Sequence, residues 1–164
     1  MTQRQYERLS APFRREAWAK GLNAVNKFLT GFCYCVYPLL LIFLAVSRDG
    51  RFWKALLVPG ISFALLSAVR DKLNAKRPYE LLDIQPIITK NTKGHSMPSR
   101  HVFSMFVIAM TFLWVLPWAG IALLCFGALL AAVRVIGGVH FPRDVIAGAL
   151  VGVLSGMLGF WVIP

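Results

Sequence analysis

The sequence predicts an all-α membrane protein, a polytopic bundle of about five transmembrane helices with an N-terminal amphipathic helix lying at the interface. Apolar residues make up 57% of the 164 residues, more than an ordinary soluble domain carries. They gather into five stretches that could cross a hydrocarbon layer of about 30 Å. No linker-like or low-complexity stretch interrupts them. We therefore expect a single membrane domain over residues 1–164, with a bundle over 28–164 and one long loop over 70–101.

The spans follow from hydropathy, and polar turns separate most of them. Pro59 and Gly60 fall inside the second span and are expected to kink it. Gly148, Gly152 and Gly156 recur at every fourth position of the last span, a pattern that favours close helix packing. The five predicted spans cover residues 28–46, 52–69, 102–116, 120–136 and 145–162.

The segment over residues 1–27 is polar and basic. Residues 1–10 are expected to be disordered or frayed. Residues 11–27 are predicted to form the amphipathic helix, because Trp18 and Leu22 lie one turn apart and charged residues occupy the other face. The segment is not typical of a cleavable signal peptide, which has a short charged head before a brief apolar run.

The charge balance is strongly basic, with 18 Lys and Arg against 7 Asp and Glu. Topology and attraction to anionic lipid headgroups explain such a balance, and an anionic substrate would add a further reason. Nucleic acid is not an expected partner, because no basic-aromatic binding module lies outside the apolar spans. Cys33, Cys35 and Cys125 lie in apolar spans without metal-ligand or disulfide spacing, so buried thiols are expected.

The polar side chains that could carry chemistry lie at one face of the membrane. An even number of crossings separates residues 70–101 from residues 134–144, so both segments emerge on the same side. Ionisable residues near apolar spans are tolerated mainly where they pair or line a polar cavity. The eight candidate site residues are Arg70, Arg77, Ser99, Arg100, His101, Arg134, His140 and Asp144.

His140 and Asp144 are four residues apart, with Pro142 at the expected start of a helix. A carboxylate beside one imidazole nitrogen fixes the tautomer and leaves the other nitrogen free as nucleophile or base. Arg134 can bring a planar donor fork that suits a phosphate. A helix-capping His and a snorkelling Arg are the structural alternative.

Two further stretches of the sequence are typical of anion-binding sites. Arg70 and Arg77 are expected on one side of a helix that continues from the second span and stops before Pro78, although a basic helix end could instead meet lipid headgroups. Pro98-Ser99-Arg100-His101 opens the third span, where helix N–H groups and the dipole attract anions. Ser99 could donate to a phosphate oxygen or only cap the helix.

Together, these motifs resemble the type 2 phosphatidic acid phosphatase family, whose core is similar to that of vanadium haloperoxidases. The family pattern is Lys-x6-Arg-Pro, then Pro-Ser-Gly-His, then Ser-Arg-x5-His-x3-Asp. The sequence departs from it where Arg70 replaces Lys, Arg100 replaces Gly and Val133 replaces Ser, and five spans stand where the family has six. The resemblance covers roughly residues 50–164, through Arg70-x6-Arg77-Pro78, Pro98-Ser99-Arg100-His101 and Val133-Arg134-x5-His140-x3-Asp144.

The resemblance implies a mechanism. His140 attacks phosphorus and forms a phosphohistidine, Asp144 orients His140, and His101 protonates the departing oxygen before activating water. The phosphate oxygens are implied to be held by Arg70, Arg77, Ser99, Arg134 and the backbone near Arg100 and His101. No metal or other cofactor is expected, because carboxylates are few and arginines can stabilise the charge.

The expected function is an integral membrane lipid phosphatase that hydrolyses a lipid phosphate or pyrophosphate. Phosphatidic acid, phosphatidylglycerophosphate, prenyl pyrophosphates such as undecaprenyl pyrophosphate, and phosphorylated lipid A are the substrates that the resemblance implies. A non-catalytic lipid-binding scaffold and a lipid phosphotransferase with the same site are the alternatives. Membrane lipids are the other expected partners, and the sequence indicates no oligomeric state.

The expected location is the cytoplasmic membrane of a bacterium. Of the 18 Lys and Arg, only Arg48, Arg51 and Lys54 fall on the face opposite the site. This asymmetry favours a cytoplasmic site, because positive charge concentrates on the cytoplasmic side. The family resemblance favours the outer face, so both orientations stay open.

Overall fold

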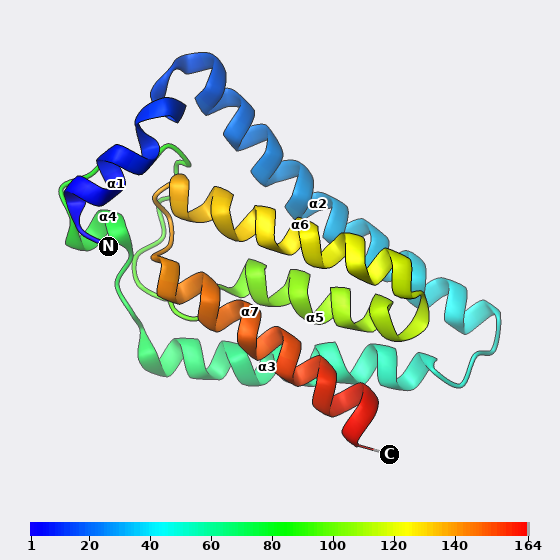
Figure 1. Cartoon of the computed structure of the whole chain (residues 1–164). Helices are drawn as coiled ribbons and strands as arrows, with labels where there is room; N and C mark the ends of the chain where they lie inside the picture. Colours follow the sequence, from blue (N-terminus) through cyan, green and yellow to red (C-terminus); the bar gives the residue numbers. More distant parts are fainter. Residues whose placement is uncertain (164) are drawn as a thin grey trace.

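The computed structural model describes residues 1–163, and every regular element in that range is a helix (Figure 1). This confirms the predicted polytopic helical bundle. Pro164, the last residue of the predicted domain, lies outside the described residues. The elements are α1 (Gln3–Ser10), η1 (Ala11–Arg14), α2 (Glu16–Val46), α3 (Phe52–Leu73), α4 (Pro78–Leu81), α5 (Arg100–Val115), α6 (Pro117–Ile136), α7 (Pro142–Met157) and η2 (Leu158–Val162).

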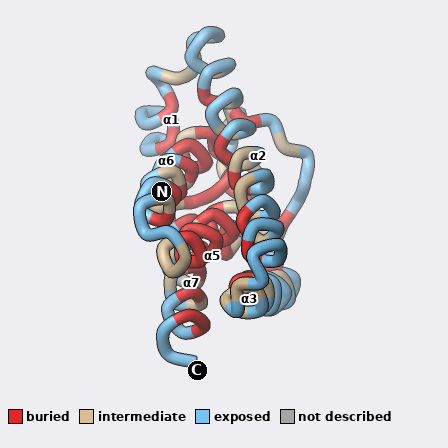
Figure 2. Tube along the Cα trace, turned by 90° about the vertical axis from the view of Figure 1, so that its right-hand side faces the viewer, coloured by how far each residue is buried: buried red, intermediate tan, exposed pale blue. Residues whose placement is uncertain are grey.

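All five predicted spans are helices, but α5 differs from the other four. It has 16 residues, fewer than the roughly 20 that a span needs. It lies in the middle of the bundle, and nearly all of its residues between Val102 and Phe112 are buried (Figure 2). Among the described residues, the four helices long and apolar enough to cross a membrane are Glu16–Val46, Phe52–Leu81, Pro117–Ile136 and Pro142–Val162. The helix whose first turn carries His101 is therefore enclosed by the others.

The prediction of a frayed start at residues 1–10 is wrong. Thr2 caps α1 through a reciprocal pair of hydrogen bonds with Gln5, which satisfies two otherwise free N–H groups. Tyr6 is fully buried, and its ring lies where a side chain on Gly138 would otherwise project. The Tyr6 hydroxyl donates to the carbonyl of Gln85 at 3.4 Å. Long-range packing, which local composition does not reveal, therefore orders this segment.

The predicted separation between an amphipathic helix over 11–27 and a first span at 28 is not observed. Residues 11–14 form a 3-10 turn, and α2 then continues from Glu16 to Val46 without a break. No helix-ending residue stands at the predicted boundary. Leu22 is buried against Ile88, Val133 and Val139 of the bundle instead of facing lipid headgroups.

The glycines of α7 hold it against α5, as the sequence predicted. A Cβ atom on Gly148 would lie 2.6 Å from the Ser99 carbonyl oxygen, and one on Gly152 would lie 2.9 Å from that of Phe103. Real side chains do not approach backbone this closely, so only glycine permits the contact. The contact places the first turn of α7 beside the first turn of α5.

The segment after α3 departs from the prediction for Arg70 and Arg77. α3 runs through Pro59 and ends at Leu73, where Asn74 adopts a left-handed conformation with φ of 36°. Arg77 therefore lies beyond the helix, at the residue before Pro78 and α4. The two arginines therefore do not share a helix face. The turn after α3 places Arg77 near Arg70.

The chemically rich segments meet at one end of the bundle. Figure 1 shows α1, α4, the loop that leads into α5 and the α6–α7 turn together at that end, with the α2–α3 and α5–α6 turns at the other. This arrangement agrees with the even number of crossings inferred from hydropathy. It gathers residues from α3, α5 and three loops around one cavity.

Candidate active site

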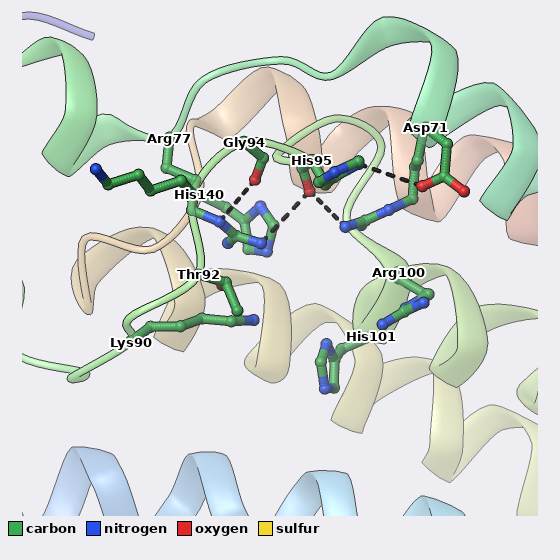
Figure 3. Close-up of a pocket in the computed structure, with 11 residues that line it drawn as sticks. Asp71, Arg77, Lys90, Thr92, Gly94, His95, Arg100, His101 and His140 are labelled. Atoms are coloured by element: carbon green, nitrogen blue, oxygen red, sulfur yellow. Dashed lines mark hydrogen bonds and ion pairs between the residues drawn. The ribbon is translucent and has the colours of Figure 1, made fainter.

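A cavity of about 220 Å³ opens at this end of the bundle (Figure 3). It can take a phosphate or diphosphate group rather than a whole lipid. Five of the eight predicted site residues line it, whereas Ser99, Arg134 and Asp144 are buried and are not among its lining residues. The lining residues are Arg70, Asp71, Arg77, Lys90, Thr92, Lys93, Gly94, His95, Arg100, His101 and His140.

His140 lies in the turn between α6 and α7 and is only 1% exposed. Its Nδ1 atom is 3.7 Å from Asp144 Oδ2, which is too long for a direct hydrogen bond. The Ser96 hydroxyl stands beside both groups, 3.4 Å from His140 Nδ1 and donating to Asp144 Oδ2 at 2.5 Å. A serine thus links the imidazole to the carboxylate. Nε2 is left as the ring nitrogen with no hydrogen-bond partner within residues 1–163.

Asp144 is fixed by the start of α7. Phe141 is the residue at the N-cap of α7. Its N–H donates a hydrogen bond to Asp144 Oδ2 at 2.9 Å, which stabilises the start of the helix. The Asp144 carbonyl accepts from the Ser99 N–H at 2.8 Å. The backbone therefore joins the second motif to the third, and Asp144 cannot move without disturbing Ser99.

Ser96 was not among the residues predicted from the sequence. It is fully buried although it belongs to a polar loop, and no spacing rule marks it. We expect Ser96→Ala to lower kcat for phosphate release by roughly 10- to 100-fold with little change in KM, because the reacting imidazole loses its orientation. Steady-state assays would check this, with the exposed Ser47→Ala at the far end of the bundle as the control. A KM effect without a kcat effect would contradict a positioning role.

Arg70 and Arg77 converge on the carbonyl oxygen of His95, to which the Nη2 atom of each donates. Arg70 Nη1 also donates to the Pro98 carbonyl at 2.7 Å, and Arg77 Nη1 to the Val139 carbonyl at 3.1 Å. Both side chains are buried. Because their partners here are neutral carbonyls, neither arginine has its charge neutralised by these contacts, and both remain available to an anion.

The imidazole of His95 is partly exposed. Its Nδ1 lies 3.2 Å from Asp71 Oδ1. The functional contribution of this residue is its carbonyl oxygen, which the sequence could not indicate.

Arg134 is buried and held from α2. Its Nη1 donates to Asn26 Oδ1 at 3.1 Å, a contact between residues 108 positions apart that the sequence did not suggest. Arg134 Nε and Ser99 Oγ have no hydrogen-bond partner among the described residues. A buried donor left unpaired costs about 1–3 kcal/mol. Such donors fit a site that is completed by the oxygens of an anion.

His101 and Arg100 stand at the first turn of α5. His101 lines the main cavity and also borders a smaller one, which lies beside Thr30 and Cys33 of α2. Arg100 is exposed at the rim, with its guanidinium carbon 5.7 Å from the ring centre of Phe63. The structure therefore places a second imidazole across the cavity from His140, with an additional cation next to it.

The protonation state of His140 follows from its surroundings. Burial lowers the pKa of the imidazole well below its ordinary value, and the positive charges of Arg134 and Arg77 act in the same direction. Asp144 opposes this shift but does not cancel it. His140 is therefore neutral at neutral pH, the state in which a ring nitrogen can act as a nucleophile.

In the part of the chain that the structure describes, no three His, Cys, Asp or Glu side chains gather closely enough to hold a metal ion. Metal independence remains a prediction.

The sequence profile of the PAP2 superfamily matches residues 51–164, more than half of the chain. The chain belongs to the PAP2 superfamily. This confirms the family indicated by the three motifs. Membership also supports the expected activity class, so this PAP2 protein is an integral membrane phosphatase that acts on a lipid phosphate or pyrophosphate.

Two relatives extend the match toward the N-terminus. The bacitracin transport permease protein BcrC of Bacillus licheniformis is 27% identical over 147 residues, which is 87% of this chain and 72% of that protein. An undecaprenyl-diphosphatase of Sulfolobus acidocaldarius is 29% identical over 135 residues, 80% of this chain and 66% of that protein.

The fold of this PAP2 protein is also similar to a solved structure. The crystal structure of Aquifex aeolicus LpxE superimposes with a TM-score of 0.76 and 24% sequence identity. The similarity covers 96% of this chain and 93% of LpxE. At that identity the comparison supports the arrangement of helices and not a shared substrate.

Proposed function

We propose that this PAP2 protein cleaves the terminal phosphate of a lipid diphosphate through a phosphohistidine on His140. The observation that carries the proposal is the pairing of His140 with a buried serine and carboxylate in a cavity lined by cations. A neutral imidazole held from one side presents its other nitrogen to a phosphorus atom that arginines hold in place.

In the first step, Nε2 of His140 forms a bond to phosphorus while the bond from phosphorus to the leaving oxygen breaks. His101 donates a proton to that oxygen, so the lipid leaves as an alcohol or as a monophosphate. The imidazole of His140 becomes positively charged, and the buried Asp144 carboxylate stabilises this charge. The Ser96 hydroxyl contacts both groups and holds the carboxylate and the imidazole ring in position relative to each other.

In the second step, His101 takes a proton from water, and the resulting hydroxide attacks the phosphohistidine. The nitrogen–phosphorus bond breaks, inorganic phosphate is released and His140 returns to its neutral form. The guanidinium groups of Arg70, Arg77 and Arg134 stabilise the oxygens of the transferring group, as does the Ser99 hydroxyl. Phosphoryl transfer depends mainly on such positioning and charge stabilisation.

A diphosphate is proposed because Arg100 adds a cation at the rim, beyond the groups that hold the first phosphate. The undecaprenyl-diphosphatase among the relatives supports the same substrate class. In Arg100→Gly, the ratio of diphosphate to monophosphate turnover should fall by about 10-fold, as expected for loss of one charge-assisted contact. Paired assays with prenyl diphosphate and prenyl phosphate measure the ratio, with the exposed Arg15→Gly as the control. An unchanged ratio would remove the diphosphate preference.

The direct test is a panel assay of phosphate release by the purified full-length chain. The panel contains prenyl phosphate and diphosphate, phosphatidic acid, phosphatidylglycerophosphate and phosphorylated lipid A, each with and without a strong chelator. The proposal expects fastest release from the diphosphate and no effect of the chelator. Activity that a chelator abolishes and magnesium restores would contradict the metal-free mechanism.

We further propose that the protein resides in the cytoplasmic membrane of a bacterium with its site on the cytoplasmic face. The charge asymmetry between the two ends of the bundle supports this orientation. Labelling of a His95→Cys variant in intact cells, without other accessible thiols, tests the side. Reaction with a membrane-impermeant reagent would place the site outside.

A further inference from the structure

Lys90 belongs to none of the three motifs, yet its side chain enters the cavity that His140 and His101 line (Figure 3). It lies in the loop between α4 and α5 and is partly buried. Within residues 1–163, no carboxylate lies within ion-pairing distance of its ammonium group, and no acceptor forms a hydrogen bond with it. A partly buried ammonium without an anionic partner is unfavourable unless a ligand supplies one.

The loop is built to hold Lys90 there. Two residues before it, Ile88 is buried, and its N–H donates to the Gly137 carbonyl at 3.1 Å. Two residues after it, the Thr92 carbonyl accepts from the Tyr79 hydroxyl at 2.5 Å. Both flanks are thus tied to other elements, and the α6–α7 turn that carries His140 provides one of the ties. The position of Lys90 relative to His140 is therefore defined by the fold.

Arg70 also presents a positive charge to the cavity, but its two terminal nitrogens donate to the carbonyls of Pro98 and His95, so its guanidinium is fixed by the loop. An ammonium is a compact point charge that can contact any phosphate oxygen, whereas a guanidinium needs a matching fork. Lys90 provides the compact cation from a different element.

The groups around Lys90 are predominantly cationic. Burial, and to a smaller extent the positive charges of the neighbouring arginines, together lower the pKa of its ammonium to about 7. An incoming phosphate would reverse this effect and hold the proton on Lys90. The charged and titratable groups that face it are Arg70 and Asp71 of α3, Arg77 before α4, Lys93 of the same loop, Arg100 and His101 of α5, Arg134 of α6 and His140 of the α6–α7 turn.

We propose that the Lys90 ammonium is a catalytic residue that contacts the phosphoryl oxygens while the group passes to and from His140. This inference rests on the proposed function. It adds a cation from outside the three motifs to the groups that stabilise the transferring phosphate. Lys90 contacts the same tetrahedral group in the substrate, the phosphohistidine and the phosphate product.

The test compares Lys90→Met and Lys90→Arg with the wild-type protein, and the exposed Lys72→Met on α3 serves as the matched control. Lys90→Met should lower kcat/KM for lipid phosphate release by roughly 10- to 100-fold, the usual effect of one charged contact. Lys90→Arg should retain activity within a few fold, and Lys72→Met should be unchanged. Isothermal titration with inorganic phosphate should show a parallel loss of affinity in Lys90→Met alone.

The pH profile adds a readout that a merely structural role would not move. In the wild type, kcat/KM should decline above pH 7 as Lys90 loses its proton in the free protein. In Lys90→Arg that decline should shift to higher pH, because a guanidinium stays charged. The same substrate is used throughout, so its own ionisation is common to both profiles.

Two results would overturn the proposal. One is a Lys90→Met variant with kcat/KM within two-fold of wild type, and the other is unchanged phosphate affinity in a variant that has lost activity. If Lys90→Met does not fold, Lys90→Arg still decides the matter through the pH profile. If the wild type releases no phosphate from any lipid, the proposed function fails, and the titration with inorganic phosphate still tests Lys90 separately.

Discussion

Replacing His140 with alanine should lower kcat for lipid phosphate release by roughly 10⁴-fold or more, since loss of a nucleophile removes the reaction path itself. The same variant should form no acid-labile phosphoprotein when mixed with radiolabelled substrate and quenched within one turnover. His95→Asn provides a control that removes an imidazole from the cavity rim and keeps a residue that tolerates the left-handed backbone there. Phosphoprotein formation in His140→Ala would rule out His140 as the nucleophile.

The depressed pKa of His140 has a second measurable effect, on stability. The folded protein keeps this imidazole neutral at pH values where the unfolded chain, with a pKa near 6.5, takes up a proton. The contribution of the neutral His140 to the free energy of unfolding is therefore fully present above about pH 6.5, and it is lost as the pH falls below that value. The difference in Tm between wild type and His140→Gln should shrink from pH 7.5 to pH 5. A constant difference would show that His140 does not titrate abnormally.

Replacing His101 with glutamine should lower kcat by about 10²- to 10⁴-fold with a lipid phosphate, because the leaving alkoxide needs a proton. An aryl phosphate such as p-nitrophenyl phosphate leaves without that help, so its first step should be much less affected. The second step still needs His101 as the base. The variant should therefore release one equivalent of nitrophenol in a burst and then turn over slowly, which rapid-mixing absorbance would detect.

Equal slowing of the first step with both leaving groups would contradict the role of His101 as an acid. Absence of the burst, with the first step intact, would contradict its role as a base. Thermal unfolding of His101→Gln in the same detergent separates these outcomes from misfolding. Both roles need His101 to face the same group as His140, which is the arrangement around the cavity.

Much of this site could be predicted from the sequence because its parts are local. The four-residue separation of His140 and Asp144 across a helix start is enough to bring the two side chains near one another. The glycine repeat of α7 correctly indicated close packing, and span counting put both halves of the site at one end. The first two inferences depend on a spacing within about one turn of helix, and the third depends on the hydropathy of each span.

The rest depends on contacts between distant segments. Ser96 and Lys90 come from the loop between α4 and α5 and Asn26 comes from α2, and nothing in their own neighbourhoods marks them as site residues. Tyr6 orders the N-terminal segment only because Gly138 leaves room for its ring. Arg77 lies beyond the helix that carries Arg70, because the left-handed backbone of Asn74 ends that helix. The seven-residue spacing of the two arginines does not indicate this turn.

The length of α2 sets the depth of the site. Its 31 residues extend about 46 Å, well beyond a hydrocarbon layer of about 30 Å. Asn26, which holds Arg134, lies in the part of α2 that precedes the most apolar stretch, so we expect the cavity to lie near the level of the phosphate groups of the leaflet. A substrate can then react without being pulled out of the bilayer. The concentration that governs the rate is its mole fraction among neighbouring lipids, and diluting the membrane with an inert lipid should slow turnover even when the amount of substrate per volume is unchanged.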